Sequence, residues 1–423
     1  MKRINIISLI LIGVATFHCM FSNSAIASAA TTGKCPEADY YGRATFDYVA
    51  GAPGQRACLR LPRGSGEVKA LLYCHQNMTE EVLFRSRRFC SLMDSLGVAM
   101  AFIQSGSQNW DVTKGCQERF DSIIADFARA TGHPEITVAP VIPFGHSAQA
   151  TFPWNFAAWN PDRTLCIISY HGDAPRTNLC GYGRENIEWG RTRNIDRIPG
   201  LMIEGEYEWW EARVRPALAF RIMYPDSRIS FLCDAGKGHF DLCEETQDYI
   251  ALFIAKSLAN PRPEGGTMYS RWMENGTEST DPHDMFWYHD REMVNLTRAR
   301  YESTRGKKMQ YVSAKVNGKE VPYMADRHIK LTTSVTGQEF RVEPIFVDET
   351  HNAASAEHAA VHPRVTIISG PVIQTEEYTF QVDPDYFGAD PRRLWSGITL
   401  CIEADGDDSY KPAVQELNIR IAE

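Results

Sequence analysis

Between residues 69 and 260, short apolar runs alternate with segments that favour helix. Six apolar runs recur along this part of the chain: KALLYCHQ, GVAMAFIQ, TVAPVIPF, TLCIISYH, GLMIEGE and RISFLCD. Helix-compatible segments separate most of them, at 79–95, 115–131, 148–160, 208–220 and 241–258. Apolar strands that alternate with helices are typical of a mostly parallel sheet with helices on both faces. The pattern predicts an α/β fold with six such strands and up to two more before residue 69.

The stretch SLANPRPEGG, residues 257–266, interrupts this alternation and has the Pro and Gly content of a linker. A helix is expected near 289–305, and Asn317-Gly318 between two alternating runs predicts a hairpin. Later strand candidates lie at 328–333, 338–346, 364–368, 377–381, 397–403 and 415–421. We therefore expect an α/β domain over 30–262 and a smaller antiparallel β-sandwich domain of accessory type over 263–423.

The first 29 residues have the pattern of a secretory signal peptide. Lys2 and Arg3 precede an apolar run from Ile6 to about Phe17, and Ala27-Ser28-Ala29 forms a small-x-small cleavage site. The apolar run is shorter than the roughly 20 residues that a membrane span needs. The sequence predicts a secreted or periplasmic protein without stable membrane insertion.

Export would bring the cysteines into an oxidising compartment. The chain has 11 cysteines, of which Cys19 lies in the predicted signal segment. We expect a bridge between Cys35 and Cys58, near the mature N-terminus. Cys74, Cys166 and Cys233 lie in apolar, strand-like runs and are expected to be buried free thiols.

The net charge and the spacing of the histidines indicate which kinds of binding partner are not expected. The net charge is −9, and loss of Lys2 and Arg3 with the signal segment makes it −11. This balance disfavours nucleic acid, because phosphate binding needs a basic face. His358 and His362 have a helical ligand spacing, but Pro363 follows at once and no third ligand is near. We expect no metal site and no cofactor.

The segment GHSAQ, residues 145–149, follows an apolar run and precedes a helix-compatible segment. A nucleophile elbow needs small residues two before and two after its serine, because the backbone turns so tightly there. Gly145 meets this requirement and Gln149 departs from it, whereas Ala148 and Ala150 are small. Ser147 is therefore a candidate nucleophile, and an ordinary turn is the alternative. His146 is expected to be structural and to pair with the backbone.

Candidates for a base and an acid follow Ser147 in the chain. Glu206 and Glu208 end the run that begins GLMIEGE, and His239 follows RISFLCD across a Gly-rich turn. Open α/β sheets place their sites at the carboxyl ends of the strands, so these residues are expected near Ser147. Glu208, Glu206 and Asp234 are all candidates for the carboxylate that orients the histidine.

From about residue 69 to 260 the chain resembles an α/β-hydrolase, in the broad group of secreted esterases and polyester depolymerases. The motifs GHSA, GEYE and GKGHF carry the resemblance. It implies Ser147 as nucleophile, His239 as base and Glu208 as acid, with Glu208 at the family position three residues after the glycine. Aspartate is commoner at that position.

The resemblance also implies an oxyanion hole made of two backbone N–H groups. One belongs to Ala148, directly after the nucleophile. The other is expected in the loop after an early strand, where the family often has His-Gly and this chain has His75-Gln76-Asn77. We expect the Gln76 N–H, with Asn77 as the next candidate.

Aromatic and basic residues near the expected mouth are candidates for substrate binding. Among the tryptophans, for which burial in the core is the alternative, Trp110 and Trp209 are the candidate platforms, and Arg176 is the predicted contact for an acidic substrate. Arg176 lies in the long polar stretch 172–199, for which a solvated, salt-bridged loop is the alternative.

The expected function is that of an exported serine hydrolase that cleaves carboxylic esters, with acyl groups on polysaccharides as a candidate substrate class. Two alternatives remain at this stage. One is a peptidase on the same fold, and the other is a non-catalytic binding protein on a hydrolase scaffold.

Overall fold

The computed structural model describes residues 46–52, 54–64, 66–104, 110–178, 187–208, 210–263, 286–322, 330–382 and 397–422. The predicted signal peptide and Cys35 lie outside these residues. Among the described helices, none is both long and apolar enough to cross a lipid bilayer.

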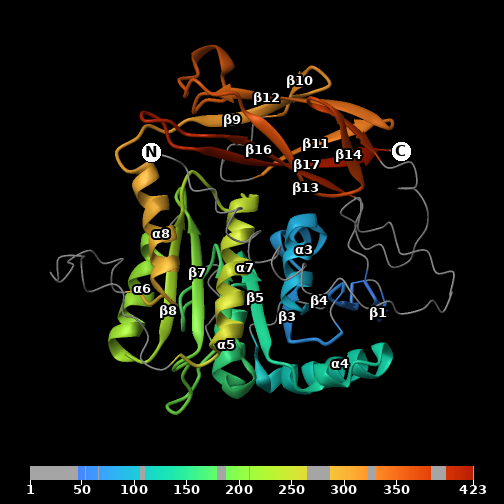
Figure 1. Ribbon diagram of the computed structural model, residues 1–423, viewed down its shortest axis with the longest axis vertical. Coiled ribbons are helices and arrows are strands. Elements are labelled where there is room, and N and C mark those ends of the chain that lie inside the picture. The colour runs from blue at the N-terminus through green and yellow to red at the C-terminus, as the bar shows by residue number, and fades with distance from the viewer. Residues whose placement is uncertain are drawn as a thin grey trace, which may run out of the picture. The chain divides into compact units, whose positions relative to one another are not determined.

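An eight-stranded sheet is built from the first part of the described chain (Figure 1). Its strand order is β1-β2-β4-β3-β5-β6-β7-β8. The strands are β1 (Tyr48–Ala50), β2 (Ala57–Arg60), β3 (Ala70–His75), β4 (Val98–Ile103), β5 (Val141–His146), β6 (Ile167–Tyr170), β7 (Pro199–Gly205) and β8 (Arg228–Asp234). Strands β3 to β8 pair in parallel, and β1 and β2 are antiparallel. This order is that of an α/β-hydrolase, which confirms the predicted fold class.

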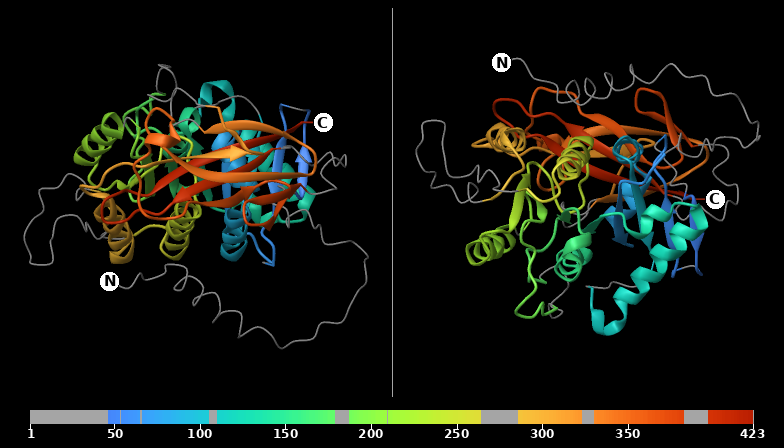
Figure 2. Two further views of the ribbon diagram at one scale, coloured as in Figure 1. Left: turned by 90° about the horizontal axis from the view of Figure 1, so that it is seen from above. Right: turned by 60° about the horizontal axis from the view of Figure 1, so that its bottom comes forward.

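The six apolar runs became the six parallel strands because helices cover both of their faces (Figure 2). Alternate residues of β3 point to opposite faces: Leu72 lies in the apolar cluster beneath α3 and α7, and Leu71 in the cluster beneath α4 and α5. The helices of this part are α2 (Met78–Arg85), α3 (Arg87–Leu96), α4 (Cys116–Thr131), α5 (Phe152–Trp159), α6 (Trp210–Met223) and α7 (Glu244–Ala259).

The last part of the chain forms two further sheets that share one apolar cluster. One sheet has the order β10-β9-β12-β15-β14 and the other β11-β17-β16-β13. The strands are β9 (Tyr311–Val316), β10 (Lys319–Glu320), β11 (Leu331–Thr336), β12 (Glu339–Val347), β13 (Arg364–Ser369), β14 (Val372–Glu376), β15 (Thr379–Val382), β16 (Ile398–Ala404) and β17 (Ala413–Ala422). The pairing is antiparallel except between β11 and β17. Asn317 and Gly318 form the predicted hairpin turn with φ of 50° and 77°.

The segment that follows residue 285 packs with the first sheet. Trp287 is buried in its core, and the Trp287 N–H donates to the Ile229 carbonyl at 2.8 Å. Helix α8 (Arg291–Thr304) lies against β8, where the Tyr301 hydroxyl accepts from the Cys233 N–H at 3.1 Å. The predicted domain boundary between residues 262 and 263 stays a prediction. The contacts given above for residues 286–304 are with the α/β part.

The described cysteines are all free thiols, at positions 58, 74, 90, 116, 166, 233, 243 and 401. Cys58 is a free thiol inside the core, and its expected partner Cys35 lies outside the described residues, so the predicted bridge stays a prediction. Cys74 and Cys166 are buried free thiols, as expected, and Cys233 is a partly buried one. Burial raises the pKa of Cys58 and Cys166 to about 12, so both thiols stay protonated at neutral pH.

Candidate active site

Ser147 lies on a strained turn between a strand and a helix. Strand β5 ends at His146, a 3-10 turn spans Ser147–Gln149, and α5 begins at Phe152. The φ of Ser147 is 52°, a left-handed conformation that residues other than glycine seldom adopt. A strained serine between strand and helix is the geometry of a nucleophile elbow, and it distinguishes this turn from an ordinary one.

Close contacts with neighbouring backbone and side chains leave room only for small residues around the elbow. A Cβ on Gly145 would lie 2.1 Å from the Gln149 carbonyl oxygen. A Cβ on Gly172 would lie 1.8 Å from the Cβ of Ala150. After the serine, the side chain in closest contact with the neighbouring loop is therefore that of Ala150 and not that of Gln149. Gln149 itself is buried, with 4% of the residue exposed.

Ser147, His239 and Glu208 form a continuous chain of contacts at the carboxyl ends of β5, β8 and β7. The Ser147 Oγ is 2.7 Å from His239 Nε2, and His239 Nδ1 is 2.6 Å from Glu208 Oε2. With Nδ1–H donating to the carboxylate, Nε2 is left to accept the serine proton. The contacts that the sequence analysis expected between these three residues are present.

Glu208 is buried and held by several donors. Its Oε1 accepts from the Gly205 N–H at 2.9 Å and lies 2.9 Å from His171 Nδ1. Its Oε2 also accepts from Arg213 Nη1 at 3.0 Å. Burial alone would raise the pKa of Glu208, but His171 and His239 outweigh it and hold that pKa well below the usual value. The carboxylate is therefore ionised at neutral pH.

The two rival carboxylates have other partners. Asp234 is bound by Lys237 Nζ at 2.6 Å and lies 3.2 Å from Arg300 Nη2. Glu206 forms an ion pair with Lys411. Among the described residues, neither carboxylate contacts the His239 ring, so the geometry favours Glu208 as the acid.

Asp234→Asn should destabilise the protein without breaking the contact between Glu208 and His239. The substitution leaves Lys237 and Arg300 buried beside a neutral amide, and breaking a buried ion pair costs about 3–5 kcal/mol. Burial would raise the pKa of Asp234, but Arg300 and Lys237 lower it from 3.8 to about 2. The stabilisation from this carboxylate is therefore present above pH 3.8 and is lost as the pH falls toward 2. Thermal unfolding of both proteins across this pH range measures the effect, and equal stability at neutral pH would contradict it.

The backbone N–H expected as the second donor of the oxyanion hole already donates to another acceptor. The Gln76 N–H donates to the Ile103 carbonyl at 2.8 Å and so extends the pairing of β3 with β4. This N–H is therefore not available to an oxyanion, which leaves Asn77, the next candidate, as the expected donor. The Asn77 side chain donates to the His146 carbonyl at 2.7 Å, which brings this residue beside the elbow. Within the described chain, the backbone N–H groups of Asn77 and Ala148 have no carbonyl acceptor.

The predicted substrate contacts are not supported. Trp110 is 1% exposed, and its ring packs against Phe120 and Phe156 in the core, so it offers no face to a substrate. The Arg176 guanidinium stacks between Trp189 and Tyr224, 5.1 and 5.3 Å from the ring centres. It joins the polar stretch 172–199 to Tyr224, which directly follows α6, and its contact with an acidic substrate stays a prediction. Trp209 lies outside the described residues.

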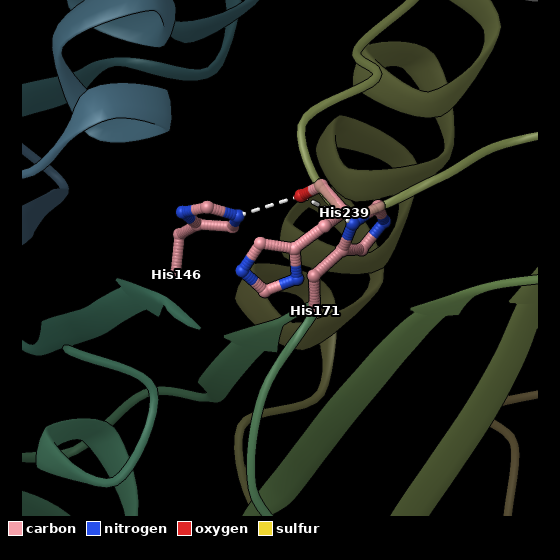
Figure 3. Close-up of side chains that lie close together, drawn as sticks. All are labelled: His146, His171 and His239. Atoms are coloured by element: carbon pink, nitrogen blue, oxygen red, sulfur yellow. Dashed lines mark hydrogen bonds between the residues drawn. The ribbon is translucent and has the colours of Figure 1, made fainter. Parts of the chain in front are cut away.

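His146, His171 and His239 form a cluster whose ligand atoms lie within 4.8 Å of one another (Figure 3). Such a cluster has the composition of a metal site, but His146 Nε2 and His171 Nδ1 each lie 2.8 Å from the His239 carbonyl oxygen. The His146 Nε2–H donates to this oxygen, whereas the His171 Nδ1–H is shared between it and Glu208 Oε1, so both rings hold the backbone of His239. His146 pairs with the backbone as expected. Burial and the neighbouring rings of His239 and His171 hold the pKa of His146 well below its usual value, so it is neutral.

His171 was missed in the sequence analysis. The signal that could have revealed it is its place directly after the run TLCIISY, since the sites of open α/β sheets form where strands end.

Comparison with known proteins returned structural matches alone. No protein-family model matches the chain, and no curated protein matches it. Est1E from Butyrivibrio proteoclasticus is 15% identical over 51% of this chain and 100% of its own, with a TM-score of 0.36. An esterase from Pyrobaculum calidifontis is 15% identical over 54% of this chain and 89% of its own, with a TM-score of 0.39. LpqC, a poly(3-hydroxybutyrate) depolymerase from Bordetella parapertussis, is 11% identical over 50% and 86%, with a TM-score of 0.30. The activity proposed below rests on the geometry of the site.

Proposed function

We propose that this protein is an exported serine hydrolase that cleaves carboxylic esters. The observation that carries the proposal is the chain of contacts from Ser147 Oγ through the His239 ring to Glu208. A serine on a strained elbow, a histidine within hydrogen-bond reach and an ionised carboxylate behind it are the parts of an acyl-transfer site.

In the first half of the reaction, Ser147 Oγ attacks the ester carbonyl and His239 Nε2 takes its proton. Glu208 stabilises the imidazolium that forms, and the N–H groups of Ala148 and Asn77 bind the oxyanion. The carbon–oxygen bond to the alcohol then breaks, and His239 returns the proton to that leaving oxygen. In the second half, water attacks the acyl-serine in the same way and releases the carboxylic acid.

Acyl substituents on extracellular polysaccharides are the proposed substrate class. Export, indicated by the signal-like residues 1–29, would bring the enzyme to such polymers. The His239 side chain is 18% exposed, so an ester on a polymer can approach the base from solvent.

A fluorophosphonate probe and two substrates test the proposal. We expect the probe to label Ser147, 4-nitrophenyl acetate to be hydrolysed, and a peptide anilide to be left intact. Absence of labelling would indicate a non-catalytic scaffold, and faster cleavage of the peptide would indicate a peptidase. Release of acetate from an acetylated polysaccharide, compared with release from the small ester, then tests the substrate class.

A further inference from the structure

The turns that carry Glu208 and His239 both contact the C-terminal sandwich. The acid turn, residues 206–208, follows β7, and the histidine turn, residues 236–241, follows β8. Lys411 of the segment between β16 and β17 forms an ion pair with Glu206 of the acid turn. The Glu416 N–H of β17 donates to Asp241 Oδ1 of the histidine turn at 3.1 Å. Residues more than 170 positions away in sequence thus hold both turns.

Glu206 connects the two turns and the sandwich through one carboxylate. Its Oε1 accepts from Lys411 Nζ, and its Oε2 accepts from the Gly236 N–H at 2.9 Å. The backbones of the turns are also joined, because the Tyr207 N–H donates to the Lys237 carbonyl at 3.1 Å. A displacement of Lys411 would therefore displace the acid turn and the histidine turn together.

Asp241 links the sandwich to the residue next to the base. Its Oδ2 accepts from the Gly238 N–H at 2.8 Å, and Gly238 directly precedes His239. Its Oδ1 accepts from the backbone of β17, and 2% of the residue is exposed. The buried carboxylate therefore fixes the spacing between β17 and the backbone that carries His239.

The sandwich and the histidine turn are in close steric contact. Gly236 has a φ of 75°, and a Cβ on it would lie 2.1 Å from the Pro412 carbonyl oxygen. Ile368 and Cys401 of the sandwich are buried in the core cluster of the α/β part. A packed contact of this kind transmits displacement instead of absorbing it.

We propose that the sandwich is a positioning element of the active site, in which Lys411 and the backbone of Glu416 hold the turns that bear Glu208 and His239. The 2.6 Å contact between Glu208 Oε2 and His239 Nδ1 needs both turns in register. The expected effect on kcat rests on the proposed function. The structural role, which is to hold the two turns in place, rests on the contacts alone.

Lys411→Met in the full chain tests the proposal. We expect kcat for 4-nitrophenyl acetate to fall between about 10- and 100-fold with little change in KM, since a misplacement of about 1 Å at a reacting group can cost about 10²-fold. The low-field proton resonance of the His239–Glu208 hydrogen bond should shift or broaden. Lys411→Arg keeps the charge and should restore both. Lys315→Met, which removes a surface pair with Glu320 on the β9–β10 hairpin, is the control and should match wild type.

Wild-type kcat together with an unchanged resonance in Lys411→Met would overturn the positioning role. If that variant does not fold, Glu206→Gln removes the same ion pair from the other side, and the same two readouts decide. A wild-type protein without esterase activity would refute the proposed function only. The resonance would still report whether Lys411 holds the two turns.

Discussion

Ser147→Ala should abolish ester hydrolysis while the protein remains folded. The alanine lacks the oxygen that attacks the carbonyl, and loss of the serine in a comparable triad costs about 10⁶-fold in kcat. Stability should change little, because alanine has the same Cβ as serine at the left-handed φ of 52°. Turnover of 4-nitrophenyl acetate and the midpoint of thermal unfolding are the two measurements.

Ser95→Ala is the matched control for this experiment. Ser95 is exposed in α3 and donates to the Leu92 carbonyl at 2.7 Å, away from the elbow. It should keep wild-type turnover and full labelling by the fluorophosphonate. Near wild-type hydrolysis by a folded Ser147→Ala protein would refute the proposed mechanism.

Glu208→Gln should lower kcat by about four orders of magnitude, as loss of the acid does in another serine triad. The His239 Nδ1–H, the Gly205 N–H and Arg213 all donate to this carboxylate, and a neutral amide offers them one acceptor oxygen. The histidine then loses the partner that fixes its tautomer and stabilises its charged form. Steady-state kinetics at saturating ester measure the effect.

Glu206→Gln is the companion variant, and it should cost much less, on the order of 10-fold through displacement of the turns. The amide oxygen can still accept from the Gly236 N–H, and the His239 ring keeps its carboxylate. A larger loss of kcat for Glu206→Gln than for Glu208→Gln would show that the acid of the triad is Glu206. Full activity of both variants would exclude the entire GEYE segment from the triad.

Much of the fold and three residues of the candidate site could be predicted from the sequence. The strands were visible because both faces of a parallel sheet are buried, which leaves continuous apolar runs. Ser147, Glu208 and His239 each directly follow such a run or the short turn after it. Chain position at a strand end is a local property, and it brings residues to the same edge of the sheet whatever the side chains around them are.

The remaining features depend on contacts between segments far apart in the chain. Pairing of β3 with β4 engages the Gln76 N–H, so Asn77 is the proposed donor instead. Packing of α4 and α5 buries Trp110, and Tyr224, directly after α6, supplies a ring that engages Arg176. No periodic pattern encodes such partners, because each depends on which surface the fold brings to that side chain.

The choice among three carboxylates was decided in the same way. Glu208, Glu206 and Asp234 all stand at strand ends, and the sequence left each of them open. Lys237 and Arg300 neutralise Asp234, and Lys411, 205 positions away, engages Glu206. Local chain geometry therefore determined where the reactive groups gather, whereas long-range packing and charge pairing decided which carboxylate faces the histidine.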